Sequence, residues 1–166
     1  MTGKTTSPAA ELISAFRARG LRLSLAESCT GGMIASALTD IAGASDVFCG
    51  SAVTYENAAK ENILGVSHKT ITEHGAVSEE CAREMAEGSK RIFTSDVALS
   101  VTGIAGPGGA VPGKPVGTVW FGCASSEGTS AFKCLFEGSR SEVRAAVVER
   151  ALRHLLSLCG VNKDER

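Results

Sequence analysis

The sequence is poor in aromatic residues and has no long hydrophobic run. It contains one Trp, one Tyr and 6 Phe, so aromatic residues make up 5% of the chain. No segment approaches the roughly 18 consecutive apolar residues that a membrane-spanning helix requires. Because 17 Lys and Arg face 18 Asp and Glu, the formal net charge is −1, and the positive field that attracts nucleic acid or anionic lipid is missing. These absences argue against a membrane protein and against direct nucleic-acid binding.

The cysteine pattern lacks the features of a zinc site or a disulfide scaffold. The six cysteines form no C-x-x-C pair and no cluster with histidine, and a chain of this length does not depend on disulfides. They are Cys29, Cys49, Cys81, Cys123, Cys134 and Cys159. The N-terminal segment also has no apolar core of the kind that a signal peptide carries. We therefore expect reduced thiols, a cytoplasmic location and no bound metal.

Length and composition indicate one globular domain. The chain has 166 residues, of which 43% are hydrophobic and 21% are charged, an ordinary composition for a folded protein. A core of this size buries roughly two-thirds of the surface that the unfolded chain exposes. The sequence shows no internal repeat and no linker long enough to divide it. It therefore predicts a single domain at 8–160, between a disordered tail at 1–7 and a C-terminal tail at 161–166.

Helical and strand patterns alternate along the chain and then give way to a hairpin and a final helix. Caps, apolar stripes and stop glycines predict helices at 8–19, 33–43, 56–65, 78–93 and 141–159. Alternating or continuous apolar runs predict strands at 21–26, 46–55, 96–101, 117–124 and 129–137. Residues 66–77 are interpreted as a connector. The order predicts an α/β fold, a three-layer α/β/α sandwich with a mixed sheet.

Ser28 is the first candidate for a catalytic residue. It lies between a predicted strand and a predicted helix and is followed by Thr30, Gly31 and Gly32. Such a turn points a side chain outward and places the unpaired N–H groups of a helix N-terminus beside it, which suits an oxyanion or a phosphate. The alternative is that Ser28 or Thr30 only caps the helix. Cys29 is a further possible nucleophile, but a small thiol in the core is the simpler interpretation.

A serine nucleophile needs a base, and Lys60 is the best candidate for that role. The three histidines, His68, His74 and His154, have no obvious acidic partner nearby, which disfavours a Ser-His-Asp triad. Lys60 stands five residues after Tyr55, the only tyrosine, so the two can meet at the end of one strand. Burial would lower the lysine pKa and make it a base. The alternative is a solvated lysine on a helix surface.

The glycine-rich segment 102–117 is the second candidate region. It follows a predicted buried strand, where open α/β sheets bind ligands, but it matches neither the Walker pattern nor the dinucleotide fingerprint. A mononucleotide or a small anion is therefore favoured over ATP. Arg140 and Arg144 stand at the start of the last predicted helix, where the helix dipole disfavours cations. A ligand phosphate would explain them, and two solvated arginines are the alternative.

Five sequence blocks carry a resemblance to a known family. They are ESCTGG at 27–32, VTYENAAKENILGV at 53–66, HGAVSEE at 74–80, TGIAGPGG at 102–109 and KPVGTVWFG at 114–122. With these blocks in order, the chain closely resembles the C-terminal domain of the competence/damage-inducible CinA proteins, the nicotinamide-nucleotide amidohydrolases. The resemblance runs from about residue 8 to residue 159 and implies the stand-alone form of the domain.

The resemblance implies an activity and the residues that carry it out. The reaction would be hydrolysis of nicotinamide mononucleotide to nicotinate mononucleotide and ammonia, in pyridine-nucleotide recycling, without metal or cofactor. The nucleophile falls on Ser28, and the assisting residues fall on Lys60 and Tyr55. The expected substrate-binding residues are Thr30, Gly31, Gly32, Asn57, Thr102, Gly103, Ile104, Gly106 and Arg140. Many relatives carry Gly-Asp-Arg where this chain has Gly138-Ser139-Arg140.

The expected mechanism is an acyl-enzyme on Ser28, with neutral Lys60 as the base and Tyr55 relaying or holding the proton. Backbone N–H groups near 30–32 or 102–103 would hold the oxyanion. The Ser-x-x-Lys pattern of serine–lysine peptidases is absent, because Gly31 stands three residues after Ser28. A rival class is a binding module that holds a mononucleotide without chemistry. A role as an interaction partner linked to competence or DNA damage is a further alternative. The family resemblance also implies a homodimer.

Overall fold

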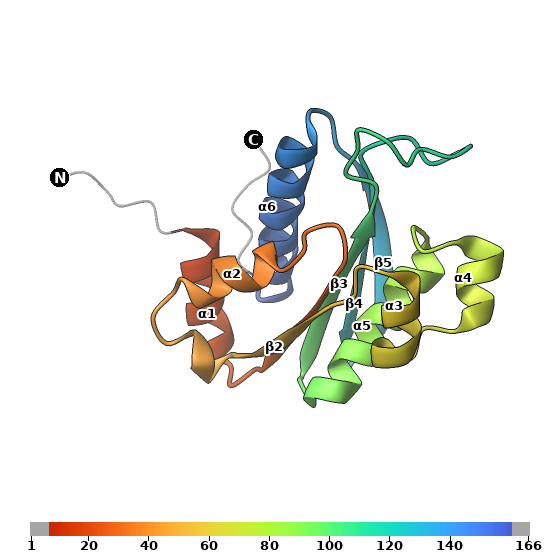
Figure 1. Cartoon of the computed structure of the whole chain (residues 1–166). Coiled ribbons are helices and arrows are strands. Elements are labelled where there is room, and N and C mark those ends of the chain that lie inside the picture. Colours follow the sequence, from red (N-terminus) through yellow and green to blue (C-terminus); the bar gives the residue numbers. More distant parts are fainter. Residues whose placement is uncertain (1–6, 161–166) are drawn as a thin grey trace.

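The structure is a computed structural model that describes residues 7–160. Of the predicted tails at 1–7 and 161–166, residues 1–6 and 161–166 lie outside the described residues. Ser7 accepts a hydrogen bond from the Ala10 N–H and forms the N-cap of the first helix, where Pro8 takes the first helical position. The predicted single α/β domain with a mixed sheet is confirmed (Figure 1).

Five strands form one sheet in the order β2-β1-β3-β4-β5. The strands are β1 (Leu23–Glu27), β2 (Phe48–Val53), β3 (Val97–Gly103), β4 (Thr118–Ser125) and β5 (Gly128–Leu135). Strands β2, β1 and β3 run parallel, whereas β3–β4 and β4–β5 are antiparallel pairs. Helices connect the parallel strands to one another. The segment 104–117, here called the arm, connects β3 to β4, and the predicted hairpin connects β4 to β5.

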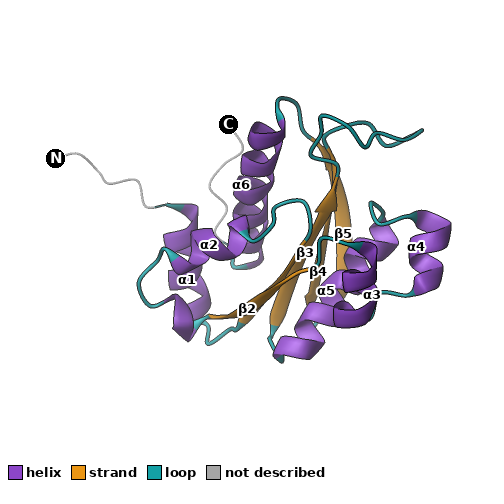
Figure 2. Ribbon diagram, viewed as in Figure 1, coloured by secondary structure: helices purple, strands orange, loops and turns teal. Residues whose placement is uncertain are grey.

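Helices cover both faces of the sheet (Figure 2). On one face lie α1 (Pro8–Ala18), α2 (Met33–Thr39) and α6 (Arg140–Leu158), and on the other α3 (Asn57–Leu64), α4 (His68–His74) and α5 (Glu79–Phe93). A short 3-10 helix, η1 (Ala44–Asp46), leads from α2 into β2. The larger core cluster packs α1, α2 and α6 against the sheet, and includes Leu12, Phe16, Leu25, Phe121 and Leu155. A smaller cluster lies beneath α3 and α5 around Met85.

Helix α4 is the α-helix that the sequence analysis did not predict. The helix has only seven residues, includes β-branched Thr70, Ile71 and Thr72, and receives no side-chain cap from Ser67. Its stability comes from α5, where the Glu84 carboxylate accepts from the Ser67 N–H at 2.7 Å and from the Thr70 hydroxyl at 2.6 Å. Because this support comes from another element, the local sequence gives no signal for it.

Candidate active site

A cavity of about 270 Å³ opens at the carboxyl ends of the parallel strands. This is the end of an open α/β sheet at which ligands bind. Its lining comes from the turns after β1 and β2, from α3, from the segment between α4 and α5, from the glycine-rich segment after β3 and from the start of α6. The lining residues are Ser28, Cys29, Tyr55, Asn57, Lys60, Ala76, Val77, Thr102, Gly103, Ile104, Ala105, Gly106, Gly108, Gly109 and Arg140.

Ser28 lies at the exit of β1, where the chain leaves the sheet. Its N–H still donates to the Val101 carbonyl at 3.1 Å, so the sheet ladder fixes its main chain. The residue is 8% exposed, and its side chain faces the cavity. The Ser28 hydroxyl is thus held at the buried side of the cavity, on a main chain that the sheet fixes.

Lys60 reaches Ser28 from the second turn of α3. Its Nζ lies 3.0 Å from Ser28 Oγ, 2.7 Å from the Thr54 carbonyl oxygen and 3.2 Å from the Tyr55 carbonyl oxygen. The residue is 1% exposed, and this burial lowers the pKa of Lys60 below the usual lysine value, because a buried ammonium loses its hydration. No carboxylate is paired with Lys60 among residues 7–160 to offset that loss.

The partners of the lysine amine favour a base next to Ser28. A carbonyl oxygen can only accept, so the two N–H groups of a neutral amine are directed to Thr54 and Tyr55. The remaining lone pair then faces Ser28 Oγ, from which it can take a proton. This arrangement allows the neutral amine to act as a general base without any change of position.

Tyr55 is in the site, but its hydroxyl faces away from the lysine. The hydroxyl accepts from the Arg140 guanidinium at 2.9 Å, and the tyrosine is 60% exposed. Tyr55 meets Lys60 through its main-chain carbonyl. The contact of Tyr55 with Lys60 therefore depends on the backbone of the turn after β2.

The two arginines at the start of α6 have different partners. Arg140 donates to the Gly106 carbonyl at 2.8 Å and lines the cavity, with N–H groups left over from its two contacts. Arg144 instead donates to the carbonyls of Cys29 and Thr30, each at 3.0 Å. Ser139 caps α6 through a capping box with Glu142, so the serine in place of the aspartate of many relatives still fixes the start of the helix.

Three of the predicted substrate-binding residues do not line the cavity. Thr30 is fully buried, and its hydroxyl donates to Glu27. The Gly31 N–H donates to the Ser28 carbonyl, and the Gly32 N–H donates to Glu27. The expectation that N–H groups at 30–32 hold an oxyanion is therefore corrected for Gly31 and Gly32, because both N–H groups are used inside the turn.

Neither the alternative nucleophile nor the alternative bases are suited to the reaction. Burial raises the pKa of the Cys29 thiol to about 11, so the thiol stays protonated near neutral pH. His68 and His74 do have acidic partners, Glu61 at 3.1 Å and Glu80 at 3.5 Å, which corrects the sequence interpretation. None of the three histidines lines the cavity.

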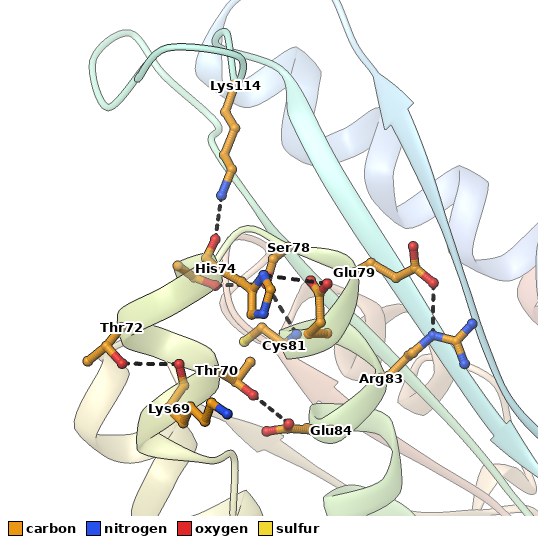
Figure 3. A network of polar contacts seen from close by, with 12 residues as sticks. Lys69, Thr70, Thr72, His74, Ser78, Glu79, Cys81, Arg83, Glu84 and Lys114 are labelled. Atoms are coloured by element: carbon orange, nitrogen blue, oxygen red, sulfur yellow. Dashed lines mark hydrogen bonds and ion pairs between the residues drawn. The ribbon is translucent and has the colours of Figure 1, made fainter.

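The wall formed by Ala76 and Val77 was missed in the sequence analysis. This wall connects α4 to α5 and is held by side chains from three segments, of which Figure 3 shows Lys114 and Ser78. Lys114 donates to the His74 carbonyl at 2.6 Å, Ser78 donates to the Gly75 carbonyl, and Thr102 donates to the Ala76 carbonyl, the last two at 2.8 Å. The block HGAVSEE, which contains both wall residues, was the available signal.

The described residues contain neither a membrane-spanning helix nor a cluster of metal-binding side chains. No helix among residues 7–160 combines the length and the apolar character needed to cross a membrane. Within the same residues, no three His, Cys, Asp or Glu side chains gather closely enough to hold a metal ion.

Comparison with known proteins gives consistent matches over this fold and site. The model of the CinA C-terminal domain matches residues 5–159. A protein of Enterobacter agglomerans named nicotinamide-nucleotide amidohydrolase PncC is 50% identical, over 88% of this chain and 92% of that protein. A CinA-like protein of Geobacter sulfurreducens is 50% identical over 82% of this chain. The chain spans about a third of the length of that relative and of several others.

Solved structures agree with the sequence comparisons. The competence/damage-inducible protein CihA from Agrobacterium tumefaciens is 43% identical with a TM-score of 0.87, over 92% of this chain and 96% of that one. A CinA superfamily protein from Klebsiella pneumoniae is 36% identical with a TM-score of 0.89, over the same shares. From these matches, the chain belongs to the CinA C-terminal domain family.

Proposed function

We propose that this chain hydrolyses the carboxamide of nicotinamide mononucleotide to give nicotinate mononucleotide and ammonia, a step in pyridine-nucleotide recycling. The observation that carries the proposal is the contact of Lys60 Nζ with Ser28 Oγ at 3.0 Å inside the cavity. The name of the relative from Enterobacter agglomerans supports the substrate class. A serine with a neutral amine beside it is suited to acyl transfer from an amide.

In the first half of the reaction, Ser28 Oγ attacks the carboxamide carbon and Lys60 Nζ takes the hydroxyl proton. The carbonyl π electrons move onto oxygen, and we assign the stabilisation of that oxyanion to backbone N–H groups of the segment 102–103, which lines the cavity. When the intermediate collapses, the C–N bond breaks and the Lys60 ammonium gives its proton to the leaving nitrogen. Ammonia departs, and the nicotinate group remains as an ester on Ser28.

In the second half, water replaces ammonia and the steps run in reverse. Neutral Lys60 takes a proton from the water as the water oxygen attacks the ester carbon. Collapse then breaks the bond to Ser28 Oγ, which recovers its proton from Lys60. The carbonyls of Thr54 and Tyr55 hold the amine in both protonation states, so the base needs no movement between the two halves.

Arg140 and Asn57 are proposed to bind the mononucleotide away from the reacting bond. Arg140 is the only arginine among the described residues that line the cavity, and a guanidinium matches a phosphate in charge and geometry. The contacts of Arg140 with Tyr55 and Gly106 hold the guanidinium across the mouth of the cavity. The phosphate end of the ligand would thus lie at the exposed side and the amide at the buried side.

Ammonia release from nicotinamide mononucleotide by the purified protein tests the proposal. We expect release by the wild type, with and without a chelator, and loss of turnover in Ser28→Ala with substrate binding retained. Ser130→Ala, a change at an exposed serine on β5, is the matched control and should keep wild-type turnover.

Two results would count against the proposal. Wild-type turnover in Ser28→Ala would remove the assigned nucleophile. If the wild type releases no ammonia but the nucleotide still raises the unfolding temperature, the chain is a mononucleotide-binding module instead.

A further inference from the structure

Glu27 is a fully buried carboxylate that the reaction does not use. It is the last residue of β1, directly before Ser28, and it is 0% exposed. None of the ion pairs among residues 7–160 includes it. A buried carboxylate without partners would be costly, so its hydrogen bonds must supply the compensation.

The Glu27 carboxylate accepts five hydrogen bonds, four of them from the turn after Ser28 and from α2. Oε2 accepts from the Thr30 hydroxyl at 2.7 Å and from the N–H groups of Gly32 and Ile34 at 3.1 Å. Oε1 accepts from the Ala35 N–H at 2.9 Å. The fifth donor is the hydroxyl of Ser51 on β2, at 3.1 Å.

These contacts replace the cap that α2 lacks. The N-cap residue of α2 is Gly32, which has no side chain, and its φ of 98° is in the left-handed region that favours glycine. The first N–H groups of a helix have no partner within it. Glu27 takes the N–H groups at the cap and at the second and third helical positions, and its charge suits this end of the helix dipole.

Arg144 holds the same turn from the opposite side. Its guanidinium donates to the Cys29 and Thr30 carbonyls, at 3.0 Å each, while Glu27 accepts from N–H and hydroxyl groups. The main chain around Ser28 is therefore fixed by a carboxylate from β1 and by a guanidinium from α6. A turn held in this way keeps Ser28 Oγ within reach of Lys60.

We propose that Glu27 is a positioning residue for the nucleophile, and that it acts by holding the turn at 28–32 in the shape that sets the contact of Ser28 with Lys60. This inference rests on the proposed function of Ser28. Glu27 touches neither the cavity nor the reacting atoms, so its loss acts on turnover through geometry alone.

Glu27→Gln tests this role with little change in shape. The amide group replaces one acceptor oxygen by a donor, and that donor then faces either the Ala35 N–H or the pair of Gly32 and Ile34 N–H groups. Since a displacement of about 1 Å can cost 100-fold in rate, we expect kcat for ammonia release to fall about 100-fold while KM stays within a small factor. Amide hydrogen exchange at 28–36 should become faster in parallel.

Two further variants separate positioning from loss of folding. Arg144→Met removes the guanidinium from the other side of the turn and should also lower kcat more than it raises KM, by roughly tenfold. Ser100→Ala removes a buried hydrogen bond to the Ala82 carbonyl, away from the turn, and should lower the unfolding temperature without changing kcat.

The outcomes can be told apart. A folded Glu27→Gln protein with wild-type kcat overturns the inference, and so does slow, wild-type exchange at 28–36. If Glu27→Gln does not fold, a wild-type kcat in Arg144→Met overturns it. A wild type that releases no ammonia defeats the proposed function instead, whereas the exchange measurement still reports whether Glu27 holds the turn.

Discussion

The two sides of the cavity differ in burial and in the origin of their rigidity. On the buried side, Ser28 and Lys60 are 8% and 1% exposed and are fixed by strand and helix contacts. On the open side, Arg140 joins Tyr55 to the segment 106–109, because its guanidinium donates to the Tyr55 hydroxyl and to the Gly106 carbonyl. The buried side is suited to proton transfer between fixed groups, and the open side to contact with a charged ligand.

The two sides of the cavity differ in their access to solvent. Burial lowers the pKa of Lys60, and a low local dielectric strengthens the interactions that stabilise a transition state. A guanidinium at the mouth keeps part of its hydration, which lets it attract a phosphate and release the product. Variants on the buried side should therefore change kcat, and variants on the open side should change KM.

The largest effect is expected for Lys60→Met. Methionine fills a similar volume, so the variant should fold, but it cannot take a proton from Ser28. We expect kcat to fall about 1000-fold, with KM changed much less. Steady-state ammonia release provides the measurement, and Lys69→Met, at an exposed lysine of α4, is the control that should stay active. If kcat of Lys60→Met stayed within tenfold of the wild-type value, Lys60 would not be the base.

Arg140→Met is expected to show the opposite pattern. Loss of a charge-assisted contact to phosphate should raise KM for nicotinamide mononucleotide roughly 10- to 100-fold, with kcat little changed. The unphosphorylated nucleoside serves as the comparison substrate, and its KM should not respond. Arg153→Met, on the exposed face of α6, is the control. An equal rise in KM for both substrates would show that Arg140 has a structural role instead.

The fold was predictable because its elements carry local signals. Pro8 and Gly20 bracket α1, the apolar run of β3 identifies a covered strand, and Ser78 caps α5 by accepting from the Cys81 N–H. These are interactions between residues close in sequence. Helix α4 was missed because it is stabilised through Glu84, which lies on α5.

The site was predictable only in part, for a similar reason. The turn after β1 and the spacing of Tyr55 and Lys60 predicted a serine nucleophile with a lysine base. The structure brings Ser28 and Lys60 together. The contact of Arg144 on α6 with the turn could not be predicted, because 114 or more residues separate the partners. Glu27 was also missed, since a carboxylate at a strand end is usually solvated and its burial depends on the packed fold.

A pH profile would sharpen the difference between the two sides. Burial lowers the Lys60 pKa, and the neutral amine is the active form. Activity should therefore be low where Lys60 is charged, rise by at most about tenfold per pH unit, and level off below the ordinary lysine pKa of about 10.4. The measurement is kcat/KM for wild type and Arg140→Met. Both profiles should have the same midpoint, because Arg140 acts on binding. A midpoint at the ordinary lysine pKa would show that Lys60 is not desolvated in solution.

The smallest effect is expected for Lys114→Met. Lys114 joins the arm after β3 to the carboxyl end of α4 through the His74 carbonyl, at 2.6 Å, where the helix dipole favours a cation (Figure 3). An isolated bridge between Val111 and Lys114 closes the arm itself and does not depend on the side chain. The variant should thus loosen only the contact between the arm and the wall at Ala76 and Val77.

Since an exposed hydrogen bond contributes about 1 kcal/mol, KM should rise about fivefold or less in Lys114→Met, with kcat unchanged. The measurement is steady-state ammonia release, with Lys133→Met on β5 as the control. A fall in kcat of tenfold or more would contradict the separation of the two sides. It would mean that the arm helps to fix Ser28 or Lys60, although neither contacts Lys114 through a hydrogen bond among the described residues.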